Sequence, residues 1–320
     1  MADILFIKTS SLGDVIHHLP ALTEARARRS DARFTWVVEE AFSPLVRLHP
    51  AAETVIPVAW RRWRNALHRR ENWREMQSFV QALRARTYDE VIDTQGLVRS
   101  ALIARCTRGR VHGYDADSIK ESPAAWFYDV RHRVERSQHA IARNRLLTAL
   151  ALGYAPSGPP DYGLDRARLA PVVAAPYGIL LHATARPEKE WPEECWRALT
   201  AVLGRDIDIV LPFGTAAERA RSERIASNTA RARVPERQPL DVMARFIAGA
   251  SFVVGIDTGL LHLAAALAVP LVAIFVGSEP GLTGPMGAGP ITVLEGRAKI
   301  PSVADVTAAV EQIVGRLRMF

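Results

Sequence analysis

The chain has 320 residues, of which 48% are hydrophobic and 23% charged, a composition typical of globular domains rather than of disordered or fibrous proteins. Its length exceeds that of one ordinary domain, so two domains of roughly 150 residues each are expected. The two cysteines, Cys106 and Cys195, lie far apart. This argues against a disulfide framework or a zinc site and fits a reducing cytoplasm.

The positive charge is distributed unevenly along the chain. The first 160 residues hold 24 Lys and Arg against 17 Asp and Glu, whereas residues 161–320 hold 17 of each, so the net charge of +7 lies in the first half. Such asymmetry predicts an acidic partner for the first half of the chain. The partner could be nucleic acid, anionic lipid or an acidic small molecule. No apolar run is long enough to span a membrane, and we expect no secretory signal at the N-terminus.

Short apolar runs alternate with amphipathic stretches, which is the pattern of parallel sheets covered by helices. In the first half the pattern predicts strands near 3–8, 33–39, 53–58, 90–94 and 110–114 and helices near 15–29, 72–86, 97–106 and 138–152. In the second half it predicts strands near 177–183, 206–211, 252–256, 270–276 and 290–294 and helices near 192–203, 216–227, 239–249, 259–268 and 303–317. The proline-rich segment 155–176 is expected to link two βα domains. A cleft between two such domains is a preferred place for a small ligand.

The first predicted strand ends in a polar turn, Thr9-Ser10-Ser11-Leu12-Gly13-Asp14. Doubly wound domains place their chemistry at the carboxyl ends of strands, so Asp14 is a candidate general base. The alternative is that Asp14 or a serine caps the helix predicted from Val15, by accepting from its free backbone N–H groups. The hexapeptide considered alone favours the cap.

A basic and aromatic stretch follows the third predicted strand. Residues 60–74 contain six arginines and one acidic residue, beginning with Trp60-Arg61-Arg62-Trp63-Arg64. Guanidinium groups match carboxylates and phosphates, and tryptophans offer stacking surfaces, so the stretch is a candidate site for an acidic ligand or nucleic acid. A solvated helix face is the other interpretation. Lys120 extends the basic character, and Asp93-Thr94-Gln95-Gly96 ends another strand with polar groups that we expect to face the cleft.

Three polar turns in the second half follow predicted strands and converge on one edge of a sheet. Asp257-Thr258-Gly259-Leu260 precedes an apolar helix whose N-terminal amides are suited to a diphosphate; the alternative is an Asp-capped buried helix with His262 in the core. Thr184 and Lys189 could bind a phosphate, although Lys189 considered alone favours the other interpretation, a solvated loop lysine. Glu218 could accept from ribose hydroxyls, or be only an ordinary charge in the first turn of a helix.

Several common nucleotide-binding patterns are missing from the sequence. No G-x-G-x-x-G follows the first strand of either half and no P-loop motif is present, which argues against a Rossmann dehydrogenase and a P-loop NTPase. Helix-turn-helix, zinc-finger and RNA-domain signatures are also missing, so we expect no nucleic acid as partner.

Six segments, taken together and in order, resemble the lipopolysaccharide heptosyltransferases of glycosyltransferase family 9. They are KTSSLGDVIHHLPAL (8–22), WVVEE (36–40), VIPVAWRRWR (55–64), VIDTQGLVRSAL (91–102), HATARPEKEWP (182–192) and DTGLLHLAAAL (257–267). The resemblance implies an α/β fold of the GT-B class, with two Rossmann-like domains whose parallel sheets face each other across a central cleft. It assigns residues 1–160 to the acceptor and 161–320 to the nucleotide sugar, and implies that the C-terminal helix can cross back to the first domain.

The resemblance also implies a reaction. Such enzymes are inverting glycosyltransferases that move L-glycero-D-manno-heptose from ADP-heptose to the first 3-deoxy-D-manno-octulosonate (Kdo) of Kdo–lipid A, in the biosynthesis of the lipopolysaccharide inner core. The alternatives are a related enzyme that takes an already heptosylated acceptor, and a non-catalytic nucleotide-binding module. The scheme needs no metal and no cofactor. Because the acceptor lies in a membrane leaflet, we expect a cytoplasmic protein that docks peripherally on the anionic inner face of the inner membrane.

Site residues follow from the matched positions. Asp14 takes the position of the general base. The donor-binding positions fall on Thr184, Lys189, Glu218, Asp257, Thr258, Gly259, Leu260 and His262. The acceptor-binding positions fall on Ser10, Gly13, Arg61, Arg62, Arg64 and Lys120. Two residues depart from the family pattern: Ala185 stands where a second threonine is expected, which removes one hydroxyl contact to the donor, and Lys120 replaces an arginine, which keeps the charge but loses the planar fork.

Overall fold

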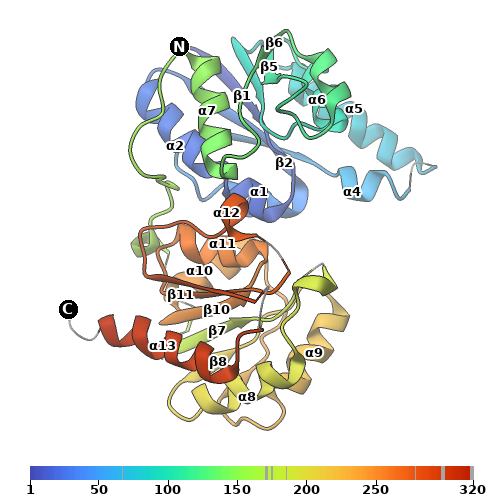
Figure 1. Cartoon of the computed structure of the whole chain (residues 1–320). Coiled ribbons are helices and arrows are strands. Elements are labelled where there is room, and N and C mark those ends of the chain that lie inside the picture. The colour runs from blue at the N-terminus through green and yellow to red at the C-terminus, as the bar shows by residue number, and fades with distance from the viewer. Residues whose placement is uncertain are drawn as a thin grey trace. The chain divides into compact units, whose positions relative to one another are not determined.

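The chain folds into two compact units, Met1–Gly163 and Leu164–Phe320, which divide close to the expected boundary after residue 160. Figure 1 shows the computed structural model with its elements labelled. The structure describes residues 1–66, 68–169, 172–173, 176–184, 186–277, 279–296 and 300–317. The assignment of the acceptor to one unit and the nucleotide sugar to the other stays a prediction.

The first unit is built on a six-stranded parallel sheet in the order β3-β2-β1-β4-β5-β6. Its strands are β1 (Asp3–Ile7), β2 (Arg33–Glu39), β3 (Thr54–Val58), β4 (Glu90–Asp93), β5 (Arg110–Tyr114) and β6 (Val130–His132). Ile4 to Ile7 of β1 are all buried, as expected of a central strand covered on both faces. The five predicted strands are confirmed. The prediction missed β6, because Val-Arg-His contains no apolar run.

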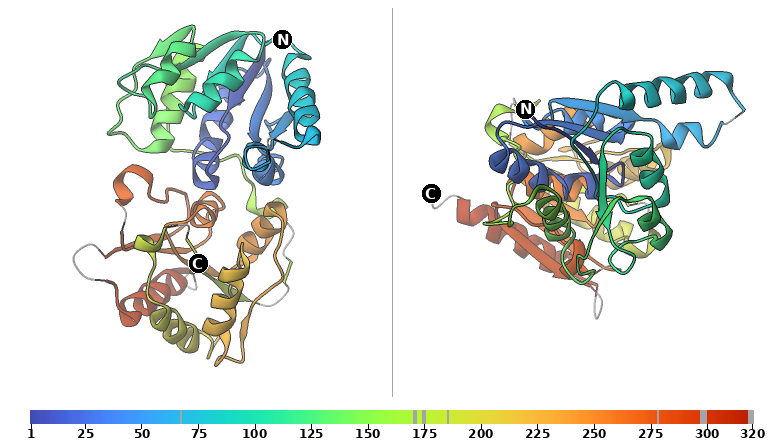
Figure 2. Two further views of the ribbon diagram at one scale, coloured as in Figure 1. Left: turned by 90° about the vertical axis from the view of Figure 1, so that its right-hand side faces the viewer. Right: turned by 90° about the horizontal axis from the view of Figure 1, so that it is seen from above.

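Seven α-helices are described in the first unit. They are α1 (Leu12–Ile16), α2 (Leu19–Arg28), α3 (Ser43–Val46), α4 (Trp60–Trp63), α5 (Arg70–Arg84), α6 (Val98–Arg105) and α7 (Ala140–Leu152). The prediction of one helix over 15–29 is wrong, since the helix is divided at His17 and His18. Pro20, in the first turn of α2, has no N–H to continue the α1 ladder, which explains the break. Helices α4 and α5 form an arm at the β3 edge of this sheet (Figure 2).

The second unit has a six-stranded parallel sheet in the order β12-β11-β10-β7-β8-β9. Its strands are β7 (Tyr177–Leu181), β8 (Asp208–Val210), β9 (Ala232–Arg233), β10 (Phe252–Ile256), β11 (Leu271–Phe275) and β12 (Ile291–Glu295). Its helices are α8 (Glu193–Leu203), α9 (Ala216–Ala226), α10 (Leu240–Gly249), α11 (Gly259–Ala266), α12 (Pro280–Thr283) and α13 (Val303–Leu317). The two-residue strand β9 and the single turn of α12 were not predicted, because neither is long enough to show a period.

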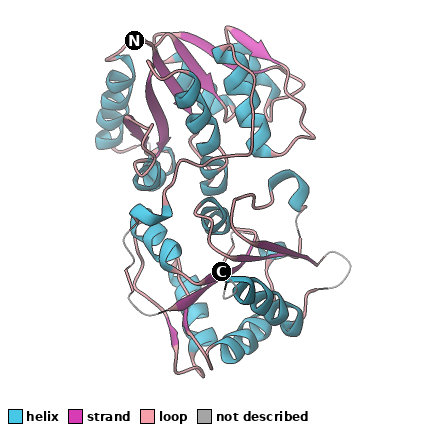
Figure 3. Ribbon diagram, turned by 90° about the vertical axis from the view of Figure 1, so that its left-hand side faces the viewer, coloured by secondary structure: helices cyan, strands magenta, loops and turns pink. Residues whose placement is uncertain are grey.

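Helices cover both faces of each sheet (Figure 3). In the second unit α10 and α11 lie on one face and α8, α9 and α13 on the other (Figure 1). The core on the side of α8 and α13 contains Trp191 and, from α8 itself, Trp196, and their rings meet edge to face with centroids 5.0 Å apart. Helix α13 packs on α8 and on β10 to β12 of its own unit. The expectation that it reaches the first unit stays a prediction, and residues 318–320 lie outside the described residues.

The two sheets share one topology. Counted from one edge, each sheet places its own strands in the order 3-2-1-4-5-6, so the direction of winding reverses between β1 and β4 and between β7 and β10. In open α/β sheets, ligands bind outside the carboxyl ends of the strands at this reversal. The turns after β1, β4, β7 and β10 are therefore where the fold itself places a site. In the part of the chain that the structure describes, no helix has the length and apolar character to cross a bilayer.

Candidate active site

Asp14 lies in the first turn of α1, directly after the turn that follows β1. Its Oδ2 accepts from the backbone N–H of Ser11 at 2.7 Å and from Ser11 Oγ at 3.0 Å. The capping interpretation is therefore correct as far as it goes. The side chain is only half-buried, and Oδ1 makes no hydrogen bond within the described residues. A cap of this kind leaves one carboxylate oxygen available to a substrate hydroxyl, so the cap and the base are compatible.

A buried lysine, which the sequence analysis did not select, lies beside this turn. Lys8 is 6% exposed, and its Nζ donates to the carbonyl oxygen of Thr94 at 2.8 Å and contacts Asn144 Oδ1 at 3.4 Å. Burial lowers the pKa of Lys8, whereas the nearby carboxylates of Asp14 and Asp93 oppose that shift. A lysine at the end of the apolar run Ile4 to Ile7 is the signal that could have pointed to it.

Three predicted acceptor-binding residues, Ser10, Gly13 and Lys120, lie in or near the turn that follows β1. Ser10 is buried, and its Oγ accepts from Arg99 Nη2 at 2.6 Å. Arg99 was also missed, and its Nε is buried without a hydrogen-bond partner in the described structure. Gly13 is in α1, next to Asp14. Lys120 is exposed and close enough to Lys8 to lower the pKa of that lysine. Ser10 and Gly13 thus lie in the same turn region as Asp14, and Lys8 is near enough to Asp14 for that carboxylate to act on its pKa.

Arg61 and Arg62 of α4 and its C-cap residue Arg64 differ in their surroundings. Arg62 forms ion pairs with Glu40 at 3.2 Å and with Glu75 at 2.8 Å, and these carboxylates raise the pKa of its guanidinium. Arg61 lies over the ring of Phe42, 5.1 Å from its centroid. Arg64 is exposed and has no ion pair within the described residues. Among these three arginines only Arg62 has a carboxylate partner within the described residues, so the guanidinium groups of Arg61 and Arg64 remain for an acidic ligand.

In the second unit Asp257 is the centre of the donor candidates. One carboxylate oxygen forms an ion pair with Lys189, and the other lies 3.6 Å from His262 Nε2. Thr184 Oγ1 contacts the carbonyl oxygen of Asp257 at 3.4 Å. The turn with Lys189 can approach because Gly277 faces it: a Cβ on that glycine would lie 2.1 Å from the Glu188 carbonyl oxygen. Residues from the ends of β7, β10 and β11 therefore meet here.

The N-terminus of α11 is formed by Thr258, Gly259 and Leu260. Thr258 is the N-cap residue, and its side chain makes no capping hydrogen bond. The alternative of an Asp-capped buried helix is wrong about the capping residue, because the N-cap is Thr258, but its expectation of a buried His262 is confirmed, since this histidine is 5% exposed. The first N–H groups of a helix have no partner within the helix, and together with the helix dipole they attract anions. The arrangement fits a phosphate group beside the ammonium of Lys189.

Glu218 lies in the first turn of α9, the helix that follows β8, and β8 is the neighbour of β7 in the sheet. Its Oε2 accepts from the backbone N–H groups of Gly214 at 2.6 Å and Thr215 at 3.1 Å, while Thr215 Oγ1 accepts from Glu218 N–H. This is a capping box, so the structural interpretation of Glu218 is correct. Oε1 has no hydrogen bond in the described structure, and the ribose role stays a prediction. Ala185 lies outside the described residues.

Comparison with known proteins decides the family. The model of glycosyltransferase family 9 (heptosyltransferase) matches residues 76–311. The chain belongs to glycosyltransferase family 9. A lipopolysaccharide heptosyltransferase 1 of Escherichia coli is 43% identical over 97% of the chain and 96% of its own length, and that of Pseudomonas aeruginosa is 46% identical over 89% of the chain and 81% of its length.

Solved structures of heptosyltransferases agree with this family assignment. The E. coli heptosyltransferase WaaC with ADP matches with a TM-score of 0.91 and 40% identity, over 97% of this chain and 99% of that one. The chain is thus a glycosyltransferase with the GT-B fold, and the expected heptosyltransferase activity in lipopolysaccharide biosynthesis is confirmed at the level of the family. E. coli heptosyltransferase II, at 20% identity and a TM-score of 0.77 over 99% of this chain and 100% of that one, shares the fold.

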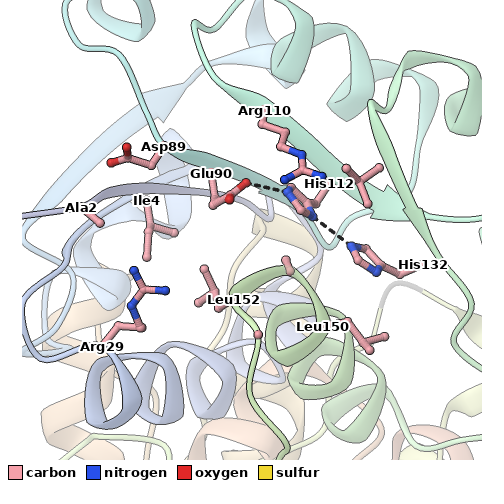
Figure 4. Close-up of a pocket in the computed structure, with 13 residues that line it drawn as sticks. Ala2, Ile4, Arg29, Asp89, Glu90, Arg110, His112, His132, Leu150 and Leu152 are labelled. Carbon is pink, nitrogen blue, oxygen red and sulfur yellow. Dashed lines mark hydrogen bonds and ion pairs between the residues drawn. The ribbon is translucent and has the colours of Figure 1, made fainter.

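A pocket of about 440 Å³ lies at the opposite, amino edge of the first sheet of this glycosyltransferase (Figure 4). A hydrogen-bonded chain crosses it: Glu90 Oε2 lies 2.5 Å from His112 Nε2, and His112 Nδ1 lies 2.9 Å from His132 Nε2. None of the predicted site residues lines this pocket. Among the described residues, no group of three or more His, Cys, Asp or Glu side chains is placed to hold a metal ion.

Proposed function

We propose that the enzyme transfers L-glycero-D-manno-heptose from ADP-heptose to the first Kdo of Kdo–lipid A, with inversion at the anomeric carbon. Relatives 43% to 46% identical over most of the chain are named lipopolysaccharide heptosyltransferase 1. The E. coli structures matched at 40% identity contain ADP and ADP-2-deoxy-2-fluoro heptose. The proposal depends on one observation: the carboxylate of Asp14 lies after β1, where the winding of the first sheet reverses, and only its Oδ2 is bonded to Ser11, which leaves Oδ1 without a hydrogen bond within the described residues.

Asp14 is proposed as the general base. A Kdo hydroxyl is a poor nucleophile, and a carboxylate within hydrogen-bond reach accepts its proton as the oxygen bonds to the anomeric carbon. Such assistance is typically worth 10² to 10⁴ in rate. One base is sufficient, because inversion takes place in a single displacement. Ser11 holds Oδ2 in place, so Oδ1 is the atom that would take the proton.

Lys189 and the N-terminus of α11 are proposed to stabilise the leaving group. Negative charge grows on the ADP phosphates as the bond to heptose breaks, and donors aimed at that charge lower the barrier. Asp257 holds the ammonium of Lys189 near the first turn of α11 before the donor arrives. Glu218 is proposed to accept from the ribose through Oε1. We propose that neither a metal nor a cofactor takes part, so transfer should persist in EDTA.

The acidic acceptor is proposed to bind the basic surface of the first unit. Arg61, Arg64 and Lys120 supply positive charge for its carboxylates and phosphates, and well-placed basic residues add about 1 kcal/mol each at an anionic membrane. We therefore propose a cytoplasmic enzyme bound peripherally to the inner face of the inner membrane. Co-sedimentation with vesicles should rise with anionic lipid and fall with salt. Binding that ignores both would contradict this part of the proposal.

The acceptor assignment has a direct test. The enzyme is given ADP-heptose with one of two acceptors, either purified Kdo–lipid A or the same molecule already carrying its first heptose. Mass spectrometry of the acceptor then measures heptose transfer. We expect the first acceptor to gain one heptose and the second to gain none. Transfer to the second acceptor alone would show an enzyme of the later step, and ADP-heptose binding without transfer to either would favour a non-catalytic module.

A further inference from the structure

We propose that Gln95 is a positioning residue for the transfer reaction: its carboxamide oxygen holds the backbone of the turn that presents Asp14. The inference rests on the proposed role of Asp14 as general base. Gln95 comes from the turn after β4, about 85 residues away in sequence from the turn after β1. The strands β1 and β4 are adjacent in the sheet, which brings the two turns together.

Gln95 Oε1 accepts two hydrogen bonds, both 3.0 Å long, from the backbone N–H groups of Thr9 and Ser10. Both residues are nearly buried, with exposures of 3% and 8%. The next N–H group along the chain, that of Ser11, donates to Asp14. Three consecutive N–H groups therefore bind side-chain oxygens in place of sheet partners, two of them through Gln95.

The order of these bonds links Gln95 to the base. Gln95 fixes the peptide planes on either side of Thr9, and the N–H of the following Ser11 orients the Asp14 carboxylate. A carboxylate that must reach a proton within about 3 Å is sensitive to small displacements of its support. Loss of the Gln95 oxygen leaves two buried donors unpaired, so the turn has to move to find other partners.

Gln95 is itself held by a buried carboxylate beneath it. Asp93 is fully buried, and its Oδ1 accepts from the N–H of Gln95 at 2.9 Å and of Gly96 at 3.3 Å. Its Oδ2 accepts from Ser100 Oγ at 2.8 Å and from Tyr128 Oη at 2.7 Å. Asp93 accepts four hydrogen bonds and, through two of them, holds the backbone N–H groups of Gln95 and Gly96 in place. From this fixed backbone the side chain of Gln95 extends to the N–H groups of Thr9 and Ser10.

The test compares two replacements that differ in one property. Gln95→Met has a similar length and no acceptor, whereas Gln95→Glu keeps an oxygen in place. We expect Gln95→Met to lower kcat by 10- to 100-fold, with the Kd for ADP-heptose within about twofold. Gln95→Glu should recover most of kcat, and its added negative charge should shift the acid limb of the kcat–pH profile upward by opposing ionisation of Asp14. Gln77→Met, an exposed change on α5, is the matched control.

A double variant separates this inference from the proposed base. If Gln95 acts through Asp14, then Asp14→Asn combined with Gln95→Met should lose no more activity than Asp14→Asn alone. Losses that multiply would overturn the positioning role, and so would an unchanged kcat in Gln95→Met while Asp14→Asn is inactive. An active Asp14→Asn enzyme would overturn the base assignment and the role of Gln95 with it. Thermal unfolding of each variant checks that it is folded, and equal loss of kcat in Gln95→Met and Gln95→Glu would indicate a merely structural role.

Discussion

Lys189 and Asp257 form an ion pair at the N-terminus of α11, and their side chains are only 17% and 10% exposed. Partial burial keeps water from screening the pair and holds the ammonium close to the helix terminus. The other oxygen of the same carboxylate lies 3.6 Å from His262 Nε2, so Asp257 contacts both side chains. The proposed donor site requires the ammonium of Lys189 to contact a phosphate of ADP-heptose as well.

Replacing Lys189 tests this arrangement. We expect Lys189→Met to lower kcat/KM on the order of a hundredfold, because a positive charge is lost where the leaving group becomes negative. Lys189→Arg should recover only part of the loss, since the larger planar group does not reproduce a compact ammonium. Steady-state kinetics with varied ADP-heptose measures both. Arg224→Met, which removes an exposed cation from the same unit, is the control and should leave kcat/KM unchanged.

Replacing Asp14 tests the base. Asp14→Asn keeps an oxygen that can accept from Ser11, so the turn should be preserved, but it removes the group that accepts a proton. We expect kcat to fall at least a hundredfold, with ADP-heptose binding nearly unchanged by calorimetry. A variant that loses donor binding to the same extent as turnover would contradict the assignment of Asp14 to catalysis.

Arg62 of α4 and the C-cap residue Arg64 should not be equivalent. Arg64→Ala should raise the KM for the acceptor several-fold, because Arg64 is exposed and free to bind an acidic group. Arg62→Ala should act mainly on stability, by less than about 1 kcal/mol, since its partners Glu40 and Glu75 are exposed and solvent weakens such pairs. Acceptor kinetics and urea unfolding distinguish the two effects. An acceptor KM that rises equally in both variants would refute the distinction.

His49 should make the enzyme less stable in acid. Its Nδ1 accepts from the N–H of Ala51 at 3.1 Å and its Nε2 lies 2.9 Å from Thr23 Oγ1, so the buried ring is neutral with its proton on Nε2. Burial lowers the pKa of His49 to about 4, against 6.5 when exposed. Below pH 6.5 the unfolded chain takes up the proton first, and stability falls until pH reaches about 4. At pH 5 the loss from this residue is about 2 kcal/mol.

Urea unfolding at pH 7 and pH 5 measures this loss. His49→Asn places Oδ1 where Nδ1 accepts and cannot take up a proton, so its stability should depend less on pH than that of the unmodified enzyme. His68→Asn, a change at an exposed histidine, is the control and should leave the pH dependence unchanged. His182, fully buried with a pKa lowered to about 4 by burial, should contribute a similar loss in the same pH range.

Much of the fold follows from local patterns of the sequence. Apolar runs such as Ile4 to Ile7 and Phe252 to Ile256 are buried on both sheet faces, and a strand of this kind is recognisable without knowing its neighbours. Short elements such as β9 carry no period and were missed. Pro20 marks the break between α1 and α2, but the apolar pattern continues across it and by itself predicts one helix.

The two doubly wound sheets, the family and the chemical groups at the strand ends can be predicted from the amino-acid sequence, because strand periodicity and motif order are properties of residues that are neighbours along the chain. The contacts that these groups make depend on the folded arrangement. Gln95 meets Thr9 and Ser10, Arg62 is neutralised by Glu40 and Glu75, and Asp257 binds Lys189 and leaves the cap of α11 to Thr258. Hydrogen bonds and ion pairs act over a few ångströms in space. Their partners are therefore set by which strands become neighbours in the folded sheet, and sequence spacing does not contain that information.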